Sequence, residues 1–381
     1  MSKQRLADRT TQKQKRGVSP EPVGDDQKFD RALRPKFLKE FVGQKKVVDK
    51  LTVFIKAAKN RREALDHVLL MGPPGLGKTT LANIIANEIG YEIISTTGPS
   101  LEKAGDLAGI LTSVPPNAVV FIDEVHRMPA PVEEILYGAM EDYKLSIVVD
   151  RGPGARNVQL EISPFTLVAA TTRAGLLSNP FRSRFGIIER LEYYDDNFLN
   201  EIVRRSASIL GVVVEDDAAF EIARRSRGTP RIANRLLRRT RDYAEVGTEV
   251  SGASSTNSVE QSTRITLEIA KHALDQLEVD KSGLDEMDKK ILTTIVDYYK
   301  GGPVGLGAVA AVVSEDPGTI EEVYEPFLLQ NGYLRRTLRG REATEKTYQF
   351  LGKKTKTQPA QNPELFEGLA KGGSGLPTKN S

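Results

Sequence analysis

The sequence predicts an α/β protein in which a domain with a parallel sheet is followed by two smaller regions. Short apolar segments alternate with longer helical patterns over residues 29–195, which is typical of a parallel sheet covered by helices. A glycine-rich loop joins the first of these strands to a helix. Residues 196–278 carry helical patterns, and residues 279–352 combine helices with Gly/Pro turns. We therefore expect a sheet domain, a small helical domain and a third domain of mixed structure.

Composition excludes several classes of protein. The 381 residues include 39% hydrophobic side chains, which is enough for two or three globular domains. The sequence lacks an apolar run of about 18 residues, so we expect no membrane span. The basic N-terminus has no apolar segment typical of a secretion signal. The absence of cysteine excludes disulfides and thiolate metal sites and fits a cytoplasmic location. The net charge of +3 is too small to indicate a nucleic-acid partner.

Three segments are rich in polar residues and poor in apolar ones. Residues 1–28 are expected to form a disordered basic arm, residues 248–263 a flexible loop, and residues 353–381 a disordered tail.

The periodicity places the strands and helices as follows. The predicted strands are His67–Met71, Val119–Ile122 and Thr166–Ala170. The predicted helices are Leu81–Ile89, Phe198–Leu210, Asp216–Arg225, Pro230–Val246, Thr266–Leu277 and Glu286–Tyr299.

A phosphate-binding loop follows the first strand. The stretch from Gly72 to Thr79 fits the pattern G-x-x-x-x-G-K-[ST], and a helix pattern begins directly after it. Glycines such as Gly75 and Gly77 let successive backbone N–H groups face a phosphate at a helix N-terminus. Lys78 would reach the β- and γ-phosphates of ATP, and the Thr79 hydroxyl would bind Mg²⁺. The alternative, a glycine turn that matches by chance, is weakened by the strand–loop–helix context.

Two acids end the second predicted strand. Asp123 and Glu124 follow four apolar residues, at the strand end where open α/β sheets bind ligands. Asp123 suits Mg²⁺ positioning, and Glu124 suits deprotonation of the attacking water. Alone, two acids after a strand usually begin a solvated loop, but the preceding phosphate loop favours an ATPase site.

The third region is predicted to be a winged helix. Asp316-Pro-Gly is a turn signal, Thr319 and Glu322 fit a capping box, and a helix would extend to Gln330. Tyr333–Thr337 and Ala343–Thr347 would form the wing. Five basic residues lie between positions 333 and 346, and Arg is suited to bidentate phosphate contacts. Three acids on the helix make it a poor reader of bases, so we expect the wing to bind the DNA backbone without sequence preference.

These motifs together resemble the RuvB family, the AAA+ motors of bacterial Holliday-junction branch migration. The resemblance covers about residues 29–352 and rests on these stretches: LRP (33–35), FVGQ (41–44), GPPGLGKTTLA (72–82), DEVHR (123–127), AATTRAGLLSNPFRSRFG (169–186), GTPRIANRLLRR (228–239), GGPVGL (301–306) and NGYLRRTLRGR (331–341). The resemblance implies an AAA+ P-loop domain, a helical lid and a C-terminal winged helix. It also implies ATP hydrolysis with Mg²⁺ and translocation along double-stranded DNA.

The resemblance assigns further residues to the ATPase site. Thr172 would be the sensor at the end of the third strand, although Thr171 and Thr172 could simply be β-branched residues that end it. Arg184, supported by Arg182, would be the finger donated to a neighbouring subunit, whereas the bare pattern also fits a solvated basic loop. Arg231 would be the sensor in the lid, where an arginine-rich helix otherwise suggests surface charge. The remaining nucleotide contacts implied by the resemblance are Leu33, Arg34, Thr80, Glu141, Asp142, Tyr143 and Tyr194.

Partners follow from the same resemblance. Arg336 and Arg341 would be the DNA contacts, and the chain would form a homohexameric ring. The segment 145–162 reads as an inserted hairpin and would dock RuvA, although a purely structural hairpin fits the pattern equally well. The resolvase RuvC is a possible further partner.

Two other functions fit parts of the sequence. A clamp-loader-like AAA+ ATPase would normally end in a helical collar rather than a winged helix. An ATP-dependent transcription regulator would need hydrogen-bonding side chains on the helix 319–330, where this chain has acids.

Overall fold

The computed structural model of the chain describes residues 32–149, 156–250 and 263–354. The expected arm, residues 1–28, lies outside these ranges, as do residues 251–262 of the expected loop and residues 355–381 of the expected tail. None of the described helices combines the length and apolarity needed to cross a bilayer.

A five-stranded parallel sheet forms the centre of the first domain. Its strand order is β2-β3-β6-β1-β7. The strands are β1 Val68–Met71, β2 Ile93–Thr97, β3 Val119–Asp123, β6 Thr166–Thr171 and β7 Ile187–Arg190. Thr97 is in register with Asp123, and Met71 with Thr171. Because all five strands run in the same direction, their carboxyl ends bring the phosphate loop, the acid pair and the Thr171–Thr172 pair to one edge of the sheet.

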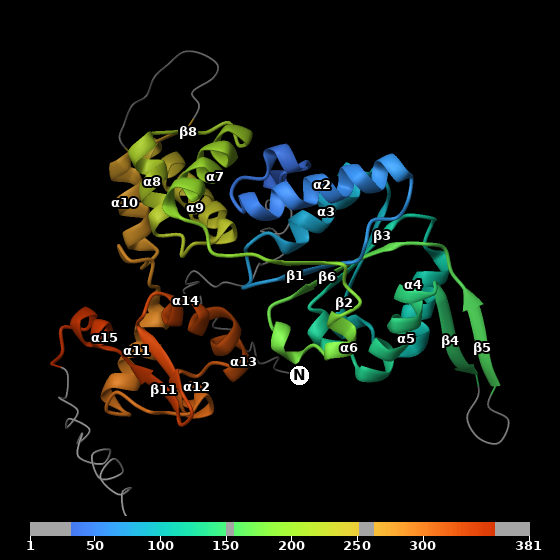
Figure 1. Cartoon of the computed structure of the whole chain (residues 1–381). Helices are drawn as coiled ribbons and strands as arrows, with labels where there is room; N and C mark the ends of the chain where they lie inside the picture. The colour runs from blue at the N-terminus through green and yellow to red at the C-terminus, as the bar shows by residue number, and fades with distance from the viewer. Residues whose placement is uncertain (1–31, 150–155, 251–262, 355–381) are drawn as a thin grey trace, which may run out of the picture.

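Helices cover both faces of this sheet. Alternate residues of β1 pack into two different apolar clusters: Val68 and Leu70 join one, and Leu69 joins the other. The first cluster includes α2 and α3, and the second includes α4 and α5, which lie on opposite sides of the sheet in Figure 1. The helices are α2 Lys45–Arg61, α3 Lys78–Ile89, α4 Ala104–Ser113, α5 Ala130–Glu141 and α6 Asn179–Arg182, with short 3₁₀ turns at Leu38–Glu40, Gly98–Ser100, Val125–Arg127 and Ala174–Leu176.

The helical domain differs in two details from the sequence prediction. Its helices are α7 Asp196–Ile209, α8 Asp216–Arg224, α9 Pro230–Val250 and α10 Leu267–Gln276. The domain is not purely helical, because β8 (Val213–Val214) pairs in parallel with β9 (Arg264–Ile265). In addition, α9 continues four residues beyond the expected end at position 246, into the segment expected to be a loop.

The third domain is a winged helix with a shifted wing. Its elements are α11 Glu286–Asp297, α12 Leu306–Val313, α13 Pro317–Thr319, η5 Ile320–Tyr324, α14 Glu325–Gln330, β10 Leu334–Thr337, β11 Gly340–Ala343 and α15 Glu345–Phe350. The second wing strand was predicted at 343–347, but β11 begins at Gly340, because a two-residue turn reverses the chain and pairs Thr337 with Gly340. Thr344 then precedes α15. The predicted capping box is also wrong, since Asp316 caps this helix and its side chain accepts from the Thr319 N–H.

The η5 segment is a π-helical turn with an identifiable cause. The turn ends at Tyr324, and Pro326 is the second residue after it. Proline has no N–H to donate to the carbonyl four residues before it, and here that carbonyl belongs to Glu322. Glu321 and Glu322 lie within this turn, and both contact Arg173 of the sheet domain.

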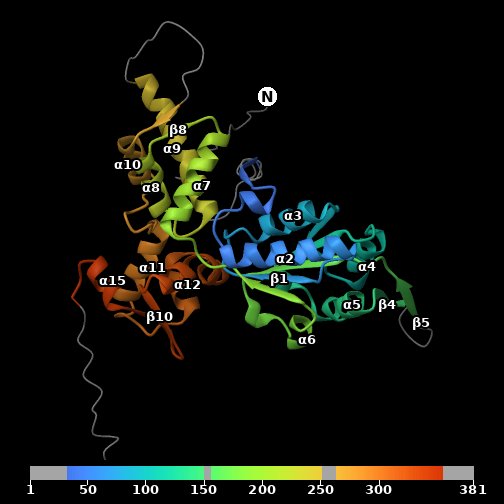
Figure 2. The same ribbon diagram turned by 45° about the horizontal axis from the view of Figure 1, so that its top comes forward.

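An antiparallel hairpin projects from the sheet domain. It consists of β4 Lys144–Val149 and β5 Arg156–Glu161, and residues 150–155 between them lie outside the described part of the chain. In Figures 1 and 2 the hairpin extends from the side of the molecule away from the lid and the winged helix. Val158 and Leu160, two residues apart on β5, are exposed.

Candidate functional site

The phosphate loop lies between β1 and α3. Gly75 and Gly77 have φ values of +83° and +99°, in the left-handed region that favours glycine. A Cβ on Gly75 would approach the Arg231 Cβ at 3.3 Å, and one on Gly77 would lie 3.3 Å from the Phe41 ring. Side chains at either position would therefore obstruct the cavity where the lid meets the loop.

Lys78 is buried at the first position of α3. Its Nζ donates to the carbonyl oxygens of Gly72 at 2.7 Å and Pro73 at 2.8 Å. Burial lowers the pKa of Lys78 to about 8, although the nearby charges of Glu124 and Asp123 oppose the shift. An anionic ligand would replace the lost solvation and favour the charged ammonium group.

Thr79 and Asp123 form the half of the site that could hold a metal ion. The Thr79 hydroxyl donates to Asp123 Oδ2 at 3.1 Å, so the two side chains already share one small space. Hydroxyl and carboxylate oxygens are the donors that Mg²⁺ prefers, with phosphate oxygens and water completing its shell. Within the described residues no group of three or more His, Asp or Glu side chains forms a metal cage. This donor set fits a metal ion that binds together with a nucleotide.

Glu124 is oriented by residues from the neighbouring strand. Its backbone has φ +48°, an uncommon conformation for a residue other than glycine and frequent at functional sites. The Thr172 hydroxyl donates to Glu124 Oε2 at 3.1 Å. His126 Nδ1 lies 3.3 Å from the same oxygen and 3.1 Å from Thr171 Oγ1. Burial, followed by the charge of Asp123, raises the pKa of Glu124, which suits a group that must accept a proton.

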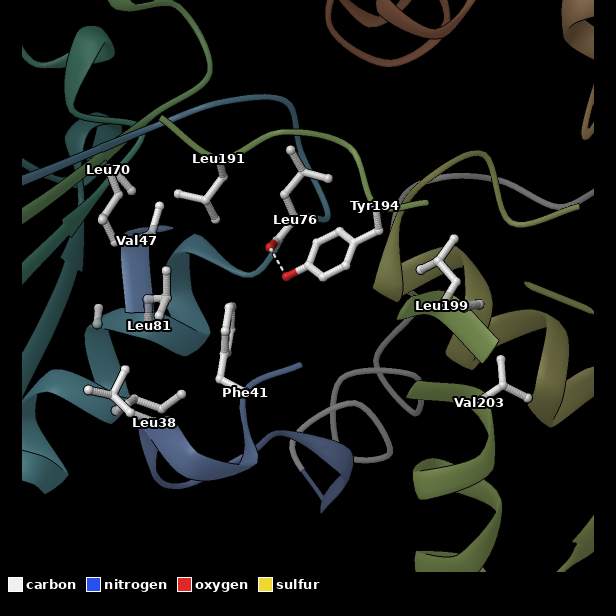
Figure 3. Packing of buried hydrophobic residues seen from close by; sticks show 14 of the residues in the cluster. Leu38, Phe41, Val47, Leu70, Leu76, Leu81, Leu191, Tyr194, Leu199 and Val203 are labelled. Atoms are coloured by element: carbon white, nitrogen blue, oxygen red, sulfur yellow. Dashed lines mark hydrogen bonds between the residues drawn. The ribbon is translucent and has the colours of Figure 1, made fainter. Parts of the chain in front are cut away.

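A cavity of about 160 Å³ opens beside these groups. Figure 3 shows Phe41 and Tyr194 facing each other near the phosphate loop, and the Tyr194 hydroxyl donates to the Leu76 carbonyl at 3.4 Å. The cavity brings together residues from the N-terminal segment, the phosphate loop and the lid. Those among the sequence candidates are Leu33, Arg34, Gly75, Gly77, Lys78, Thr79, Thr80, Asp123, Glu124, Tyr194 and Arg231. Thr172 lines an adjoining cavity of about 190 Å³ together with Glu124 and Arg231.

Arg184 and the segment 141–143 lie elsewhere. Neither cavity is lined by Arg184, Glu141, Asp142 or Tyr143. Arg184 donates to Glu141 at 3.2 Å and to the Pro180 carbonyl at 2.7 Å, and its guanidinium lies 4.3 Å from the centre of the Tyr137 ring. The structure therefore places Arg184 away from the two cavities of its own chain.

The wing arginines share a buried carboxylate. Arg336 and Arg341 each form two hydrogen bonds with Glu325, at 2.8 to 3.3 Å. Burial opposes ionisation of Glu325, but the hydrogen bonds from Arg341 and Arg336 lower its pKa overall. The Arg336 side chain is 52% exposed and that of Arg341 16% exposed. Because a guanidinium carries five N–H groups, Glu325 can orient both arginines while they still face solvent.

Sequence reasoning missed three features around the site. His126, within the motif DEVHR, was given no role, although it contacts Glu124. Arg173, directly after the Thr171–Thr172 pair, was given no role, and it bridges to Glu321 and Glu322 of the winged helix. Arg227, four residues before Arg231, is buried against the winged helix. The DEVHR motif could have pointed to His126, but the other two contacts join residues far apart in the sequence.

Comparisons with known proteins agree across the chain. Residues 33–191 match a family described as the Holliday junction DNA helicase RuvB P-loop domain. Residues 194–280 match the RuvB AAA lid domain, and residues 281–352 match the RuvB C-terminal winged helix domain.

Individual relatives give the same result. The Holliday junction branch migration complex subunit RuvB of Myxococcus xanthus is 55% identical over 347 residues, which cover 91% of this chain and 96% of that protein. The structure of the Thermotoga maritima RuvB Holliday junction branch migration motor aligns with a TM-score of 0.76 and 51% identity, covering 85% of this chain and 100% of that one. A substituted form of the same protein aligns equally well, at 50% identity.

Proposed function

The chain belongs to the RuvB family, and from that premise we propose how its residues perform the family's reaction. It is an ATP-driven motor and DNA helicase of Holliday junction branch migration, with an AAA+ P-loop domain, a lid and a winged helix. We assign residues 29–195, 196–278 and 279–352 to these three domains.

We assign the chemistry of ATP hydrolysis to the cavity beside the phosphate loop. Lys78 contacts the β- and γ-phosphates, and the loop amides around Gly75 and Gly77 hold the phosphate chain. Thr79 and Asp123 hold Mg²⁺, which neutralises phosphate charge when bound. Glu124 accepts the proton of the attacking water. Thr172 holds the Glu124 carboxylate in position, as their hydrogen bond of 3.1 Å supports.

The nucleotide also contacts the lid. Arg231 lines the same cavity from the first turn of α9, so a γ-phosphate would draw the lid toward the sheet domain. Tyr194, Leu33, Arg34 and Thr80 surround the remainder of the nucleotide. Hydrolysis would then release Arg231 and change the angle between the two domains.

A homohexameric ring completes each site. Arg184 donates its guanidinium to the neighbouring subunit's ATP, with Arg182 beside it. Glu141, Asp142 and Tyr143 lie on the same edge and face that neighbour's nucleotide. A guanidinium supplied in trans stabilises the charge that develops on the transferred phosphoryl group. In related ATPases and GTPases it raises kcat by a factor of about 10³–10⁵.

DNA and protein partners bind away from the cavity. Arg336 and Arg341 contact the phosphates of double-stranded DNA without sequence preference. The hairpin β4–β5 docks RuvA, which loads the ring on the junction, and the exposed apolar pair Val158 and Leu160 supplies the contact surface. RuvC would join the assembled complex rather than this chain alone.

The observation that carries this assignment is the meeting of two hydrogen-bonded pairs at adjoining cavities: Thr79 and Asp123 line the first, Thr172 lines the second, and Glu124 lines both. Its test is the ATPase rate at several protein concentrations, with and without duplex DNA and RuvA. We expect the rate per subunit to rise with concentration and with DNA, and Glu124→Gln to abolish it. A rate that ignores both concentration and DNA would contradict the ring motor.

Subunit mixing tests the trans finger directly. Lys78→Ala subunits cannot bind the phosphates, and Arg184→Ala subunits cannot assist a neighbour. Each variant alone is expected to be inactive. A mixture should regain part of the activity, because an Arg184→Ala subunit can receive the finger of a Lys78→Ala neighbour. Absence of recovery would contradict the role of Arg184.

A further inference from the structure

The winged helix touches the ATPase domain directly beside the candidate site. Arg173 Nη2 lies 2.9 Å from Glu321 Oε2 and 3.0 Å from Glu322 Oε1. Arg173 follows Thr172 in the chain, and its backbone N–H donates to Thr171 Oγ1 at 3.0 Å. The ion pair is therefore one residue away from the threonine that orients Glu124.

The same acidic turn also touches the wing. Glu321 Oε1 lies 3.5 Å from Arg336 Nη2 and 3.8 Å from Arg341 Nη2. One carboxylate is thus shared between an arginine of the ATPase domain and the two arginines assigned to DNA. The Arg173, Glu321 and Glu322 side chains are 31%, 32% and 34% exposed, so the contacts can rearrange without exposing a buried charge.

Glu322 faces the catalytic carboxylate. It lines the cavity of about 190 Å³ that also contains Glu124, Thr172 and Arg231. Its negative charge is one of the influences that raise the pKa of Glu124, after burial and Asp123. The position of the winged helix therefore changes the electrostatic environment of the group that activates water.

We propose that Arg173 and Glu321 couple DNA phosphate binding at the wing to the seating of the winged helix on the ATPase site. Three arginines share the charge of the Glu321 carboxylate, with Arg173 at Oε2 and the two wing arginines at Oε1. A DNA phosphate that engages Arg336 or Arg341 takes up part of their charge, so that Glu321 pairs more fully with Arg173. Arg173 in turn draws Glu321 away from the wing and leaves its arginines more available to phosphate. By linkage, each event favours the other to the same extent.

Arg173 is in this view a positioning residue that contacts neither DNA nor the attacking water. Glu321, which contacts both sides, lies in the π-helical turn, and such turns are frequent at functional sites. The inference rests on the proposed role of the wing in DNA binding.

The test is a double-mutant cycle in the full-length protein, read as the affinity for a duplex of mixed sequence in the absence of ATP. Arg173→Ala is expected to weaken binding about two- to fivefold, because Glu321 then pairs with Arg336 and Arg341. In a Glu321→Gln background the same substitution should have no effect. Arg173→Lys, which keeps the charge, should recover part of the affinity.

A matched pair separates this coupling from general charge effects. Arg204 and Asp216 form an exposed ion pair in the lid at 3.2 Å, so Arg204→Ala removes the same charge without freeing Glu321. The Arg204→Ala and Asp216→Asn cycle should be additive. Additive effects in the Arg173 and Glu321 cycle would overturn the proposal.

The control substitution Arg336→Ala separates the role of the wing in DNA binding from the coupling through Arg173. If Arg336→Ala weakens DNA binding while Arg173→Ala does not, the coupling is overturned and the wing assignment stands. If Arg336→Ala and Arg341→Ala both leave DNA binding unchanged, the wing assignment fails and the coupling fails with it. If the cycle supports the coupling, DNA should also stimulate the kcat of Arg173→Ala less than that of the wild type. The KM for ATP should change little.

Discussion

The winged helix meets the rest of the molecule at two junctions of opposite character. At the first, Arg227 of the lid pairs with Asp285 and Asp288, both at 3.0 Å, and the three side chains are 6%, 11% and 0% exposed. At the second, Arg173 pairs with two acids at similar distances, but all three side chains are about one-third exposed. Two junctions with the same chemistry therefore differ mainly in solvent access, which decides whether an ion pair can exchange partners.

The buried junction joins the lid and the winged helix into one unit. The Arg227 guanidinium also lies 4.4 Å from the centre of the Phe327 ring. Arg227 lies four residues before Arg231, which lines the candidate site. One short segment of the lid therefore contacts both the candidate site and the winged helix.

The largest expected effect is on the buried junction. Arg227→Ala would leave the charge shared by Asp285 and Asp288 buried without its cation, a change that typically costs about 3–5 kcal/mol. We expect the lid and winged-helix unit to lose this much stability. Faster hydrogen exchange of the α11 backbone amides would measure the loss. Arg204→Ala, at an exposed pair, should change exchange by less than about 0.5 kcal/mol. Equal exchange in the two variants would show that the buried pair does not join the domains.

A second prediction concerns pH. Burial raises the pKa of Asp288 to about 8, opposed by Arg227 and reinforced by the charge of Asp285. Tyr324 of the winged helix also faces this group. The folded protein thus keeps a proton that the unfolded chain releases above its ordinary pKa near 4. Stability should therefore fall as pH rises toward 8, by about 2 kcal/mol between about pH 6 and pH 8, and level off above.

Asp288→Asn mimics the protonated carboxyl group. The variant should match the wild type near pH 6 and show no decline toward pH 8 in the same α11 exchange measurement. A wild type that is equally stable across this range would mean that Arg227 keeps Asp288 ionised throughout.

The two junctions also mark the limit of what the sequence could predict. Lys78, Thr79, Asp123 and Glu124 were assigned from short motifs, because a phosphate loop and a strand-end acid pair act through local backbone geometry. The contact between Arg173 and Glu321 joins residues about 150 positions apart, and nothing in the local pattern of either segment requires the other. The pair Arg227 and Asp288 has the same character.

Local patterns failed where a tertiary contact or a turn overrode them. Strand β7 was missed because its apolar and polar residues do not alternate. Ile187 and Glu189 are buried, with Glu189 paired with Lys50 at 2.9 Å, while Ile188 is exposed. The sequence Ile-Ile-Glu-Arg therefore lacks the apolar–polar alternation that predicts a strand. In the wing helix, Thr319 fits a capping box, but Pro317 is suited to the first helical turn and Asp316 takes the cap.

The smallest expected effect is on the exposed junction, and this effect should depend on the salt concentration. Arg173→Ala should reduce the stability of the winged-helix seating by about 1 kcal/mol or less at low ionic strength, as exposed pairs do. In about 1 M salt the screening length falls to about 3 Å, and the difference from the wild type should disappear. The Arg227→Ala difference should persist, since water and ions do not reach a buried pair. Hydrogen exchange of the η5 and α11 amides at both ionic strengths provides the measurement. If salt removes both differences, the two junctions are alike in solution, and the division into a fixed and an exchanging contact is wrong.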